Sequence, residues 1–221
     1  MAETKSISTL RLIFIPSVIA LFITLLRLVG ELQHWPTALF NREAGGGGAL
    51  IGISWLPLIF GVYFALKLSE AGKGPEDRGR AVRLSIVGVL LFIAGIAIGA
   101  IPQLGTAVKV AIGLVLAVLA IGLQYTGWPK LFNVLLAYGF ASRIPVLIVM
   151  FIAMRGDWQT HYDVVQPQYA ELTFWPKFLL LAFLPQMFLW IVLTIIPGML
   201  TGSIAAAIKQ RKNPTAQTAG A

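Results

Sequence analysis

The 221-residue chain is 57% hydrophobic and 12% charged, and its mean hydropathy is +0.83. Charged residues alone make up about 25% of soluble domains, so this composition excludes an ordinary soluble protein. The absence of cysteine excludes disulfide bonds, thiolate metal sites and iron–sulfur clusters. The net charge of +8 raises the question of nucleic-acid binding, but the basic residues flank apolar segments, so we expect no nucleic-acid partner.

Six apolar stretches follow one another along the chain, and most approach the roughly 20 residues that a helix needs to cross about 30 Å of hydrocarbon. Their apolar residues run continuously instead of alternating with polar ones, which argues against a β-barrel. The sequence therefore predicts an all-α polytopic membrane bundle of six transmembrane helices, forming one domain over residues 1–208. A basic and then polar cytoplasmic tail, residues 209–221, is predicted to be disordered. The six stretches are 12–29, 49–66, 84–101, 108–123, 131–154 and 178–200.

The first stretch ends in two charged residues, Arg27 and Glu31, which lie four positions apart and therefore share one helical face. This spacing predicts an ion pair. We expect the stretch to be retained as a membrane helix and not cleaved as a signal peptide. Arg27 interrupts its end, and no small-x-small cleavage site follows before Glu31.

Four consecutive glycines, 45–48, precede the second stretch. No Gly-Lys-Ser/Thr follows them and no predicted strand precedes them, so they do not match a phosphate-binding P-loop. We interpret the run as a flexible hinge in the outer loop. The alternative is a loop that folds back toward a central cavity and offers backbone N–H groups to a ligand.

The third and fourth stretches contain few polar side chains, which predicts scaffold or lipid-facing helices. Gly95 and Gly99 form a Gly-x-x-x-Gly pattern in the third stretch. Because small residues let two helix backbones approach closely, this pattern predicts a helix-packing face.

Trp-Pro pairs precede the fifth and sixth stretches, at residues 128–129 and 175–176. Proline suits the first turn of a helix, and tryptophan favours the headgroup layer of a membrane. Each pair therefore predicts a helix start at the membrane interface.

Arg143 is the least expected residue in the fifth stretch. It lies 13 residues after Lys130 and 12 before Arg155, which mark the two ends of that stretch. At 1.5 Å per residue, about 18 Å of helix separates it from either end, farther than an arginine can reach by snorkelling. A charge there costs between about 2.5 and 17 kcal/mol, and no carboxylate occurs at comparable depth. Arg143 is therefore predicted to meet an inward-dipping loop, backbone carbonyl groups and water, or an anionic ligand.

Two residues near Arg143 make the ligand possibility more specific. Pro145 lacks an N–H group and clashes with the carbonyl group of Ala141, so the helix is predicted to break at residues 142–145. An outer half-helix beginning at Pro145 would present free N–H groups beside the guanidinium, an arrangement suited to a carboxylate or phosphate. Gln186 in the last stretch is predicted to reach the same depth. In the structural alternative, Arg143 is bonded to carbonyl groups freed by the kink and to Gln186. The predicted ligand site comprises Ser142, Arg143, Pro145 and Gln186.

A second candidate site lies on the predicted outer side, where both histidines and three carboxylates fall. Imidazole and carboxylate groups are common ligands of divalent metals and common acid–base groups. Their spacing matches no established metal motif, so simple hydrogen bonding is the alternative. We expect no cofactor. The candidate metal residues are Glu31, His34, Asp157, His161 and Asp163.

Basic residues are unevenly distributed between the two sides of the predicted bundle. With a cytoplasmic N-terminus, eleven of the 17 Lys and Arg residues fall in inner segments, four in outer segments and two within spans. In chains with short loops, such an excess sets the orientation by the positive-inside rule. Both termini are therefore predicted to be cytoplasmic, in a protein integral to the plasma membrane, which is the inner membrane in a bacterium. The lipid bilayer is its first predicted partner.

Three functions are compatible with these features. The first is a small transporter or receptor for an anionic small molecule or lipid headgroup, with Arg143 as its charge anchor. The second is an accessory or assembly subunit of a larger membrane complex, in which Arg143 pairs with a carboxylate of another subunit. The third is a membrane enzyme that uses the outer Glu/His/Asp cluster. Neither a catalytic nor a transport signature is present, and of these three functions we place the enzyme last.

Overall fold

The computed structural model describes residues 7–45 and 49–212. These residues are mainly helical and include no strand, which confirms the all-α class. They form two compact units. Unit 1 comprises the described residues of Met1–Leu12, Pro57–Leu136 and Val192–Ala221, and unit 2 comprises those of Ile13–Leu56 and Ala137–Ile191.

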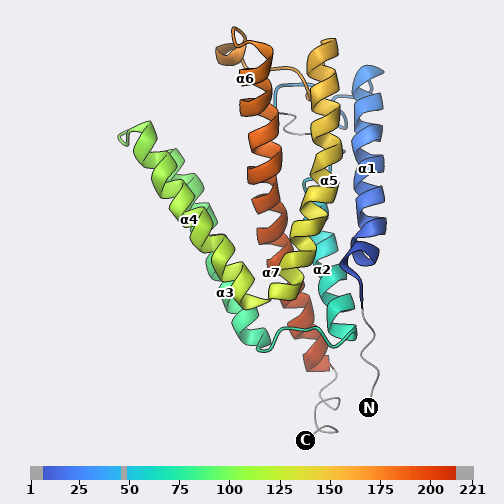
Figure 1. Ribbon diagram of the computed structural model, residues 1–221, viewed down its shortest axis with the longest axis vertical. Coiled ribbons are helices and arrows are strands. Elements are labelled where there is room, and N and C mark those ends of the chain that lie inside the picture. The colour runs from blue at the N-terminus through green and yellow to red at the C-terminus, as the bar shows by residue number, and fades with distance from the viewer. Residues whose placement is uncertain (1–6, 46–48, 213–221) are drawn as a thin grey trace, which may run out of the picture. The chain divides into compact units, whose positions relative to one another are not determined.

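Long helices account for most of the described chain (Figure 1). The last membrane-length helical stretch changes character along its length, from α-helix to two π-helical segments and back to α-helix. In chain order the helices are α1 Thr9–Leu32, α2 Leu56–Glu70, α3 Arg78–Gly99, α4 Thr106–Gly127, α5 Pro129–Gly156, the 3-10 turn η1 Pro167–Tyr169, α6 Phe174–Phe178, the π-helices η2 Leu179–Phe183 and η3 Pro185–Leu189, and α7 Trp190–Lys212.

Five helical stretches among the described residues are long and apolar enough to cross a membrane, which indicates a membrane protein. They are α1, α3, α4, α5 and the continuous stretch Phe174–Lys209. The predicted second span differs, because residues 49–55 form bends and turns and α2, with 15 residues, begins only at Leu56. At the other end of the chain, α7 includes Lys209–Lys212, which the sequence had placed in the tail, and residues 213–221 lie outside the described residues.

Glycine allows α2 and α7 to pack closely in unit 1. A Cβ atom at Gly61 of α2 would overlap the backbone of Gly198, and one at Gly202 would meet the carbonyl oxygen of Gly61. Gly198 and Gly202 form a second Gly-x-x-x-Gly pattern. The predicted pattern in α3 is confirmed in part, because Gly95 packs against Gly113 of α4 while nothing lies within 4 Å of a Cβ at Gly99.

The connection between α2 and α3 is held by specific local interactions. Gly72 adopts a φ of 71° after α2, and the N–H groups of Gly72 and Lys73 donate to the carbonyl oxygens of Ser69 and Leu68. These two hydrogen bonds form a Schellman motif, which ends a helix with a residue in the left-handed conformation. Asp77 then caps α3 by accepting a hydrogen bond of 2.9 Å from the N–H of Arg80.

Both Trp-Pro pairs lie at helix starts, because Pro129 begins α5 and residues 175–176 lie in the first turn of α6. Their tryptophans differ in environment. Trp175 is 58% exposed, as an interfacial anchor would be, but Trp128 is 1% exposed. The indole N–H of Trp128 donates to the carbonyl oxygen of Lys73 at 3.0 Å. Trp128 is therefore packed against protein instead of being exposed as a headgroup anchor, and its burial helps to hold the α2–α3 connection.

Candidate functional site

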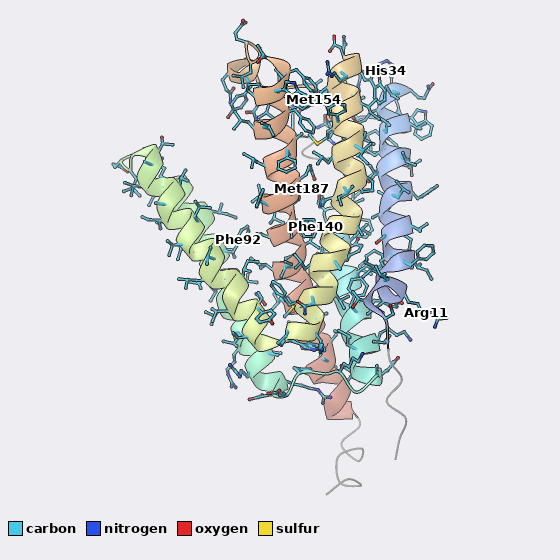
Figure 2. All side chains as sticks on the ribbon, in the orientation of Figure 1. Arg11, His34, Phe92, Phe140, Met154 and Met187 are labelled. Atoms are coloured by element: carbon cyan, nitrogen blue, oxygen red, sulfur yellow. The ribbon has the colours of Figure 1, made fainter. Side chains whose placement is uncertain are left out.

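Unit 2 contains a cavity of about 490 Å³, within the range of about 300–1,000 Å³ typical of small-molecule sites. Its walls come from α1, the segment before α2, α5, the loop after α5 and the π-helical part of the last stretch. Met154, which lines the cavity, lies near the same end of unit 2 as His34 (Figure 2). The sequence predicted that two of the lining residues, Arg143 and Gln186, share a site, and the cavity brings them together.

Arg143 projects into this cavity from α5 and is 4% exposed. Its guanidinium carbon lies 4.4 Å from the centroid of the Trp190 ring, a cation–π contact. The Nε atom of Arg143 has no hydrogen-bond partner, and no carboxylate of the described residues forms an ion pair with this guanidinium. The described protein atoms therefore compensate the buried charge only in part.

The predicted break of α5 does not occur. The helix continues from Pro129 to Gly156 with Pro145 inside it, so no half-helix N-terminus lies beside Arg143. The hydroxyl group of Ser142 donates to the carbonyl oxygen of Gly139 at 3.0 Å. Neither Ser142 nor Pro145 is among the described residues that line the cavity. Membrane helices often tolerate proline when a nearby side chain bonds freed backbone groups.

Gln186 lies in η3, the second π-helical segment, and is 8% exposed. Its Nε2 atom is 3.6 Å from the sulfur of Met150, while its Oε1 atom has no hydrogen-bond partner. No hydrogen bond joins it to Arg143 in the described structure, so the predicted structural pairing is not observed. Wide π-helical turns occur frequently at functional sites, and two residues of this one, Pro185 and Gln186, line the cavity.

Trp190 is the site residue that the sequence analysis missed. It lies four positions after Gln186, and residues four apart share a helical face. Both residues line the cavity. The four-residue spacing between Gln186 and Trp190 could therefore have identified Trp190 from the sequence, since a tryptophan on the face of the predicted polar contact offers its ring to the guanidinium.

Glu31 and His161 meet at the C-terminal end of α1. Glu31 is 1% exposed and accepts a hydrogen bond of 2.8 Å from the Nε atom of Arg27, which confirms the predicted ion pair. Its second oxygen accepts a hydrogen bond of 2.9 Å from the backbone N–H of His161, and the His161 ring contacts the first oxygen through Nδ1. One buried carboxylate thus connects α1 to the loop that follows α5.

The same loop is attached to α1 and to itself by further bonds. The hydroxyl group of Tyr162 donates to the carbonyl oxygen of Thr24 at 3.1 Å. Asp163 accepts hydrogen bonds from the backbone N–H groups of Gln159 and Thr160 and from the Thr160 hydroxyl group. His161, Tyr162 and Asp163 all line the cavity, so these bonds shape the wall that this loop provides.

Burial changes the proton affinities of this loop. Desolvation lowers the pKa of His161, an effect only partly opposed by the Glu31 carboxylate that contacts its ring. Burial also raises the pKa of the Tyr162 hydroxyl group. Both side chains are therefore uncharged near neutral pH, and His161 acts there as a neutral imidazole.

The five candidate metal residues do not converge. His34 and Asp157 are exposed turn residues with positive φ angles of 55° and 50°, whereas Glu31 and His161 contact each other and Asp163 caps its own turn. Among the described residues, no group of three or more His, Asp or Glu side chains is arranged to hold a metal ion. The bonds to Glu31 and Asp163 instead hold the loop in place.

The segment that flanks the glycine run forms part of the cavity wall. Gly45, Ala49 and Gly52 line the cavity, while glycines 46–48 lie outside the described residues. Gly45 has a φ of 82°, which favours glycine, and a Cβ at Gly52 would come within 3.2 Å of an Arg27 nitrogen. Residues on both sides of the glycine run thus line the cavity. This observation favours the folded-back alternative and argues against the flexible outer hinge.

No protein-family model matches this chain, and no curated protein or solved structure matches it either.

Proposed function

We propose that this protein is a small membrane transporter or receptor that binds an anionic small molecule or lipid headgroup at Arg143. The observation that carries the proposal is a guanidinium, 4% exposed, that borders a cavity of about 490 Å³ without a carboxylate partner among the described residues. A buried cation without a counter-ion is costly, so an anion in the cavity would stabilise the folded protein.

A ligand screen on the purified protein tests this proposal. The panel contains benzoate, citrate, inorganic phosphate and glycerol 3-phosphate, and the readout is the melting temperature at increasing concentrations. We expect at least one anion to raise the melting temperature in a saturable manner, because a ligand that binds only the folded state stabilises it. Counterflow in proteoliposomes with that anion then separates a transporter, which exchanges it, from a receptor, which does not.

The chain offers a matched control for Arg143. Arg155 belongs to the same helix and stacks over an aromatic ring, 4.3 Å from the centroid of Phe174, but it is exposed and does not line the cavity. Arg143→Gln should abolish the response, Arg143→Lys should retain part of it, and Arg155→Gln should leave it unchanged. Equal responses in Arg143→Gln and the wild type would refute the charge anchor.

An accessory-subunit role is the second candidate, and the α3–α4 hairpin favours it. Only Ala81, Ser85 and Gly88 of α3 and Ala120 and Gln124 of α4 are buried, so the stretch from residue 89 to residue 119 exposes its apolar side chains. Figure 2 shows side chains projecting outward from this hairpin. Crosslinking from position 118 in native membranes distinguishes the roles, since a subunit gives one defined protein adduct and a lipid-facing helix gives none.

We further propose six crossings with both termini in the cytoplasm, the second made by residues 49–55 together with α2. Support comes from unit 1, where Lys73 donates to the carbonyl oxygen of Ile7 and Lys209 pairs with Glu70 at 2.9 Å. Both described ends thus lie beside the α2–α3 connection, which supports an even number of crossings. In this cysteine-free chain, Arg80→Cys should be labelled only from the cytoplasmic side and Gln168→Cys only from the other side.

A further inference from the structure

We infer that the ligand of this cavity is an amphipathic monocarboxylate, with one carboxylate group for Arg143 and an apolar body for the surrounding walls. This inference rests on the anion-binding function proposed above. It narrows the ligand from any anion to a single chemical class.

The charges around the cavity favour a single negative charge over a double one. Two arginines line it, but Arg27 is matched by the Glu31 carboxylate at 2.8 Å. Asp163 also lines the cavity and is held by N–H and O–H donors with no cation among the described partners. A phosphate monoester, which carries about −1.5 to −2 charges at pH 7, would therefore meet one unmatched guanidinium and one carboxylate. A carboxylate adds one negative charge, which Arg143 balances.

The walls favour an apolar body on that carboxylate. The cavity surface around Arg143 includes the rings of Trp55 and Trp190 and the side chains of Val146, Met154 and Leu181. Apolar surface that a ligand covers contributes favourably to binding, whereas a fully polar ligand would lose its hydration against these walls. The volume of about 490 Å³ suits a small organic acid and is too small for an entire two-chain phospholipid.

The test compares probes that share one chain length and differ in their head group. Octanoate, octyl phosphate and octan-1-ol are titrated against the purified protein, together with acetate as a carboxylate without a body. We expect octanoate to raise the melting temperature at concentrations about tenfold lower than octyl phosphate or acetate, and octan-1-ol to have no saturable effect. Met154→Trp narrows an apolar wall and leaves Arg143 in place. It should weaken the binding of octanoate and leave the binding of acetate unchanged.

The outcomes separate this inference from the function on which it rests. If octyl phosphate protects better than octanoate, the site binds anions but the ligand class is wrong. If acetate protects at the same concentrations as octanoate, the inference that the ligand carries an apolar body is wrong. If octan-1-ol protects as well as octanoate, the site does not recognise the carboxylate and the ligand class is wrong. If no anion protects at all, the anion-binding function is refuted as well. Because Arg143→Gln could fail to fold, Arg143→Lys serves as the second variant and should weaken octanoate binding by several-fold while keeping wild-type yield.

Discussion

The backbone N–H of His161 donates a 2.9 Å hydrogen bond to the buried carboxylate of Glu31, a residue 130 positions earlier in the chain. The same carboxylate is bonded to Arg27 and contacts the His161 ring, so it connects α1 to the loop that walls the cavity. A buried acceptor with three contacts is costly to remove, because the donors that it satisfies stay desolvated without its carboxylate.

Glu31→Gln should therefore destabilise the protein strongly. The amide keeps the shape of the side chain but leaves the Arg27 charge without its carboxylate, and breaking a buried pair costs about 3–5 kcal/mol. Glu43→Gln is the matched control, because Glu43 is exposed and its exchange should change the free energy of unfolding by about 0.5 kcal/mol or less. Unfolding by SDS titration in mixed micelles measures both variants, and similar values for the two would contradict the tethering role of Glu31.

Acidification should destabilise the protein through His161. Burial lowers the pKa of this imidazole in the folded protein below the value of 6.5 that applies to the unfolded chain. The unfolded state therefore binds the proton first, so the stabilisation is fully present above about pH 6.5 and is lost as the pH falls through and below that value. Between pH 7.5 and pH 5.5, the melting temperature of His161→Gln should fall less than that of the wild type. His34→Gln changes an exposed histidine, and its melting temperature should fall as much as that of the wild type.

The depth of Arg143 could be predicted from the sequence, and its surroundings could not. Lys130 and Arg155 mark the ends of its span, so position alone placed the guanidinium far from either end. The cavity is formed by segments up to about 165 positions apart, from Ile23 to Trp190, and no local pattern records that they meet. Pro145 misled the prediction, because a helix can continue past a proline when tertiary packing holds it.

The glycine patterns show the same limit. The sequence contains Gly95-x-x-x-Gly99 and Gly198-x-x-x-Gly202, and nothing local distinguishes them. In the structure the second pattern meets the backbone of Gly61 closely, while nothing lies within 4 Å of a Cβ atom placed on Gly99. Spacing identifies a helix that can approach another closely, but only the partner helix decides which glycine is needed.

Alanine at Gly61 should therefore destabilise unit 1. Its Cβ would overlap the backbone of Gly198, which cannot move aside as a flexible side chain would, and overpacking of this kind costs about 1–3 kcal/mol. Gly122 in α4 is the control, since nothing lies within 4 Å of a Cβ there and alanine should stabilise the helix by about 0.5–1 kcal/mol. The two variants should shift the SDS unfolding midpoint in opposite directions, and a shift in the same direction would contradict the close α2–α7 packing.

The contact between Arg143 and Trp190 can be measured with a double-mutant cycle. A guanidinium 4.4 Å from an indole centroid in a buried site should be coupled to it by about 0.5–2 kcal/mol. The cycle uses Arg143→Gln, Trp190→Leu and the double variant, so that the packing lost with the indole cancels and the pairwise energy remains. Arg155 and Phe174 provide a second cycle at an exposed site, where the 4.3 Å contact should couple by about 0.5 kcal/mol because water screens the charge. A coupling near zero between Arg143 and Trp190 would mean that the ring only fills space. In that case a ligand would have to supply all of the compensation for the buried charge, and Trp190→Leu would leave anion binding unchanged.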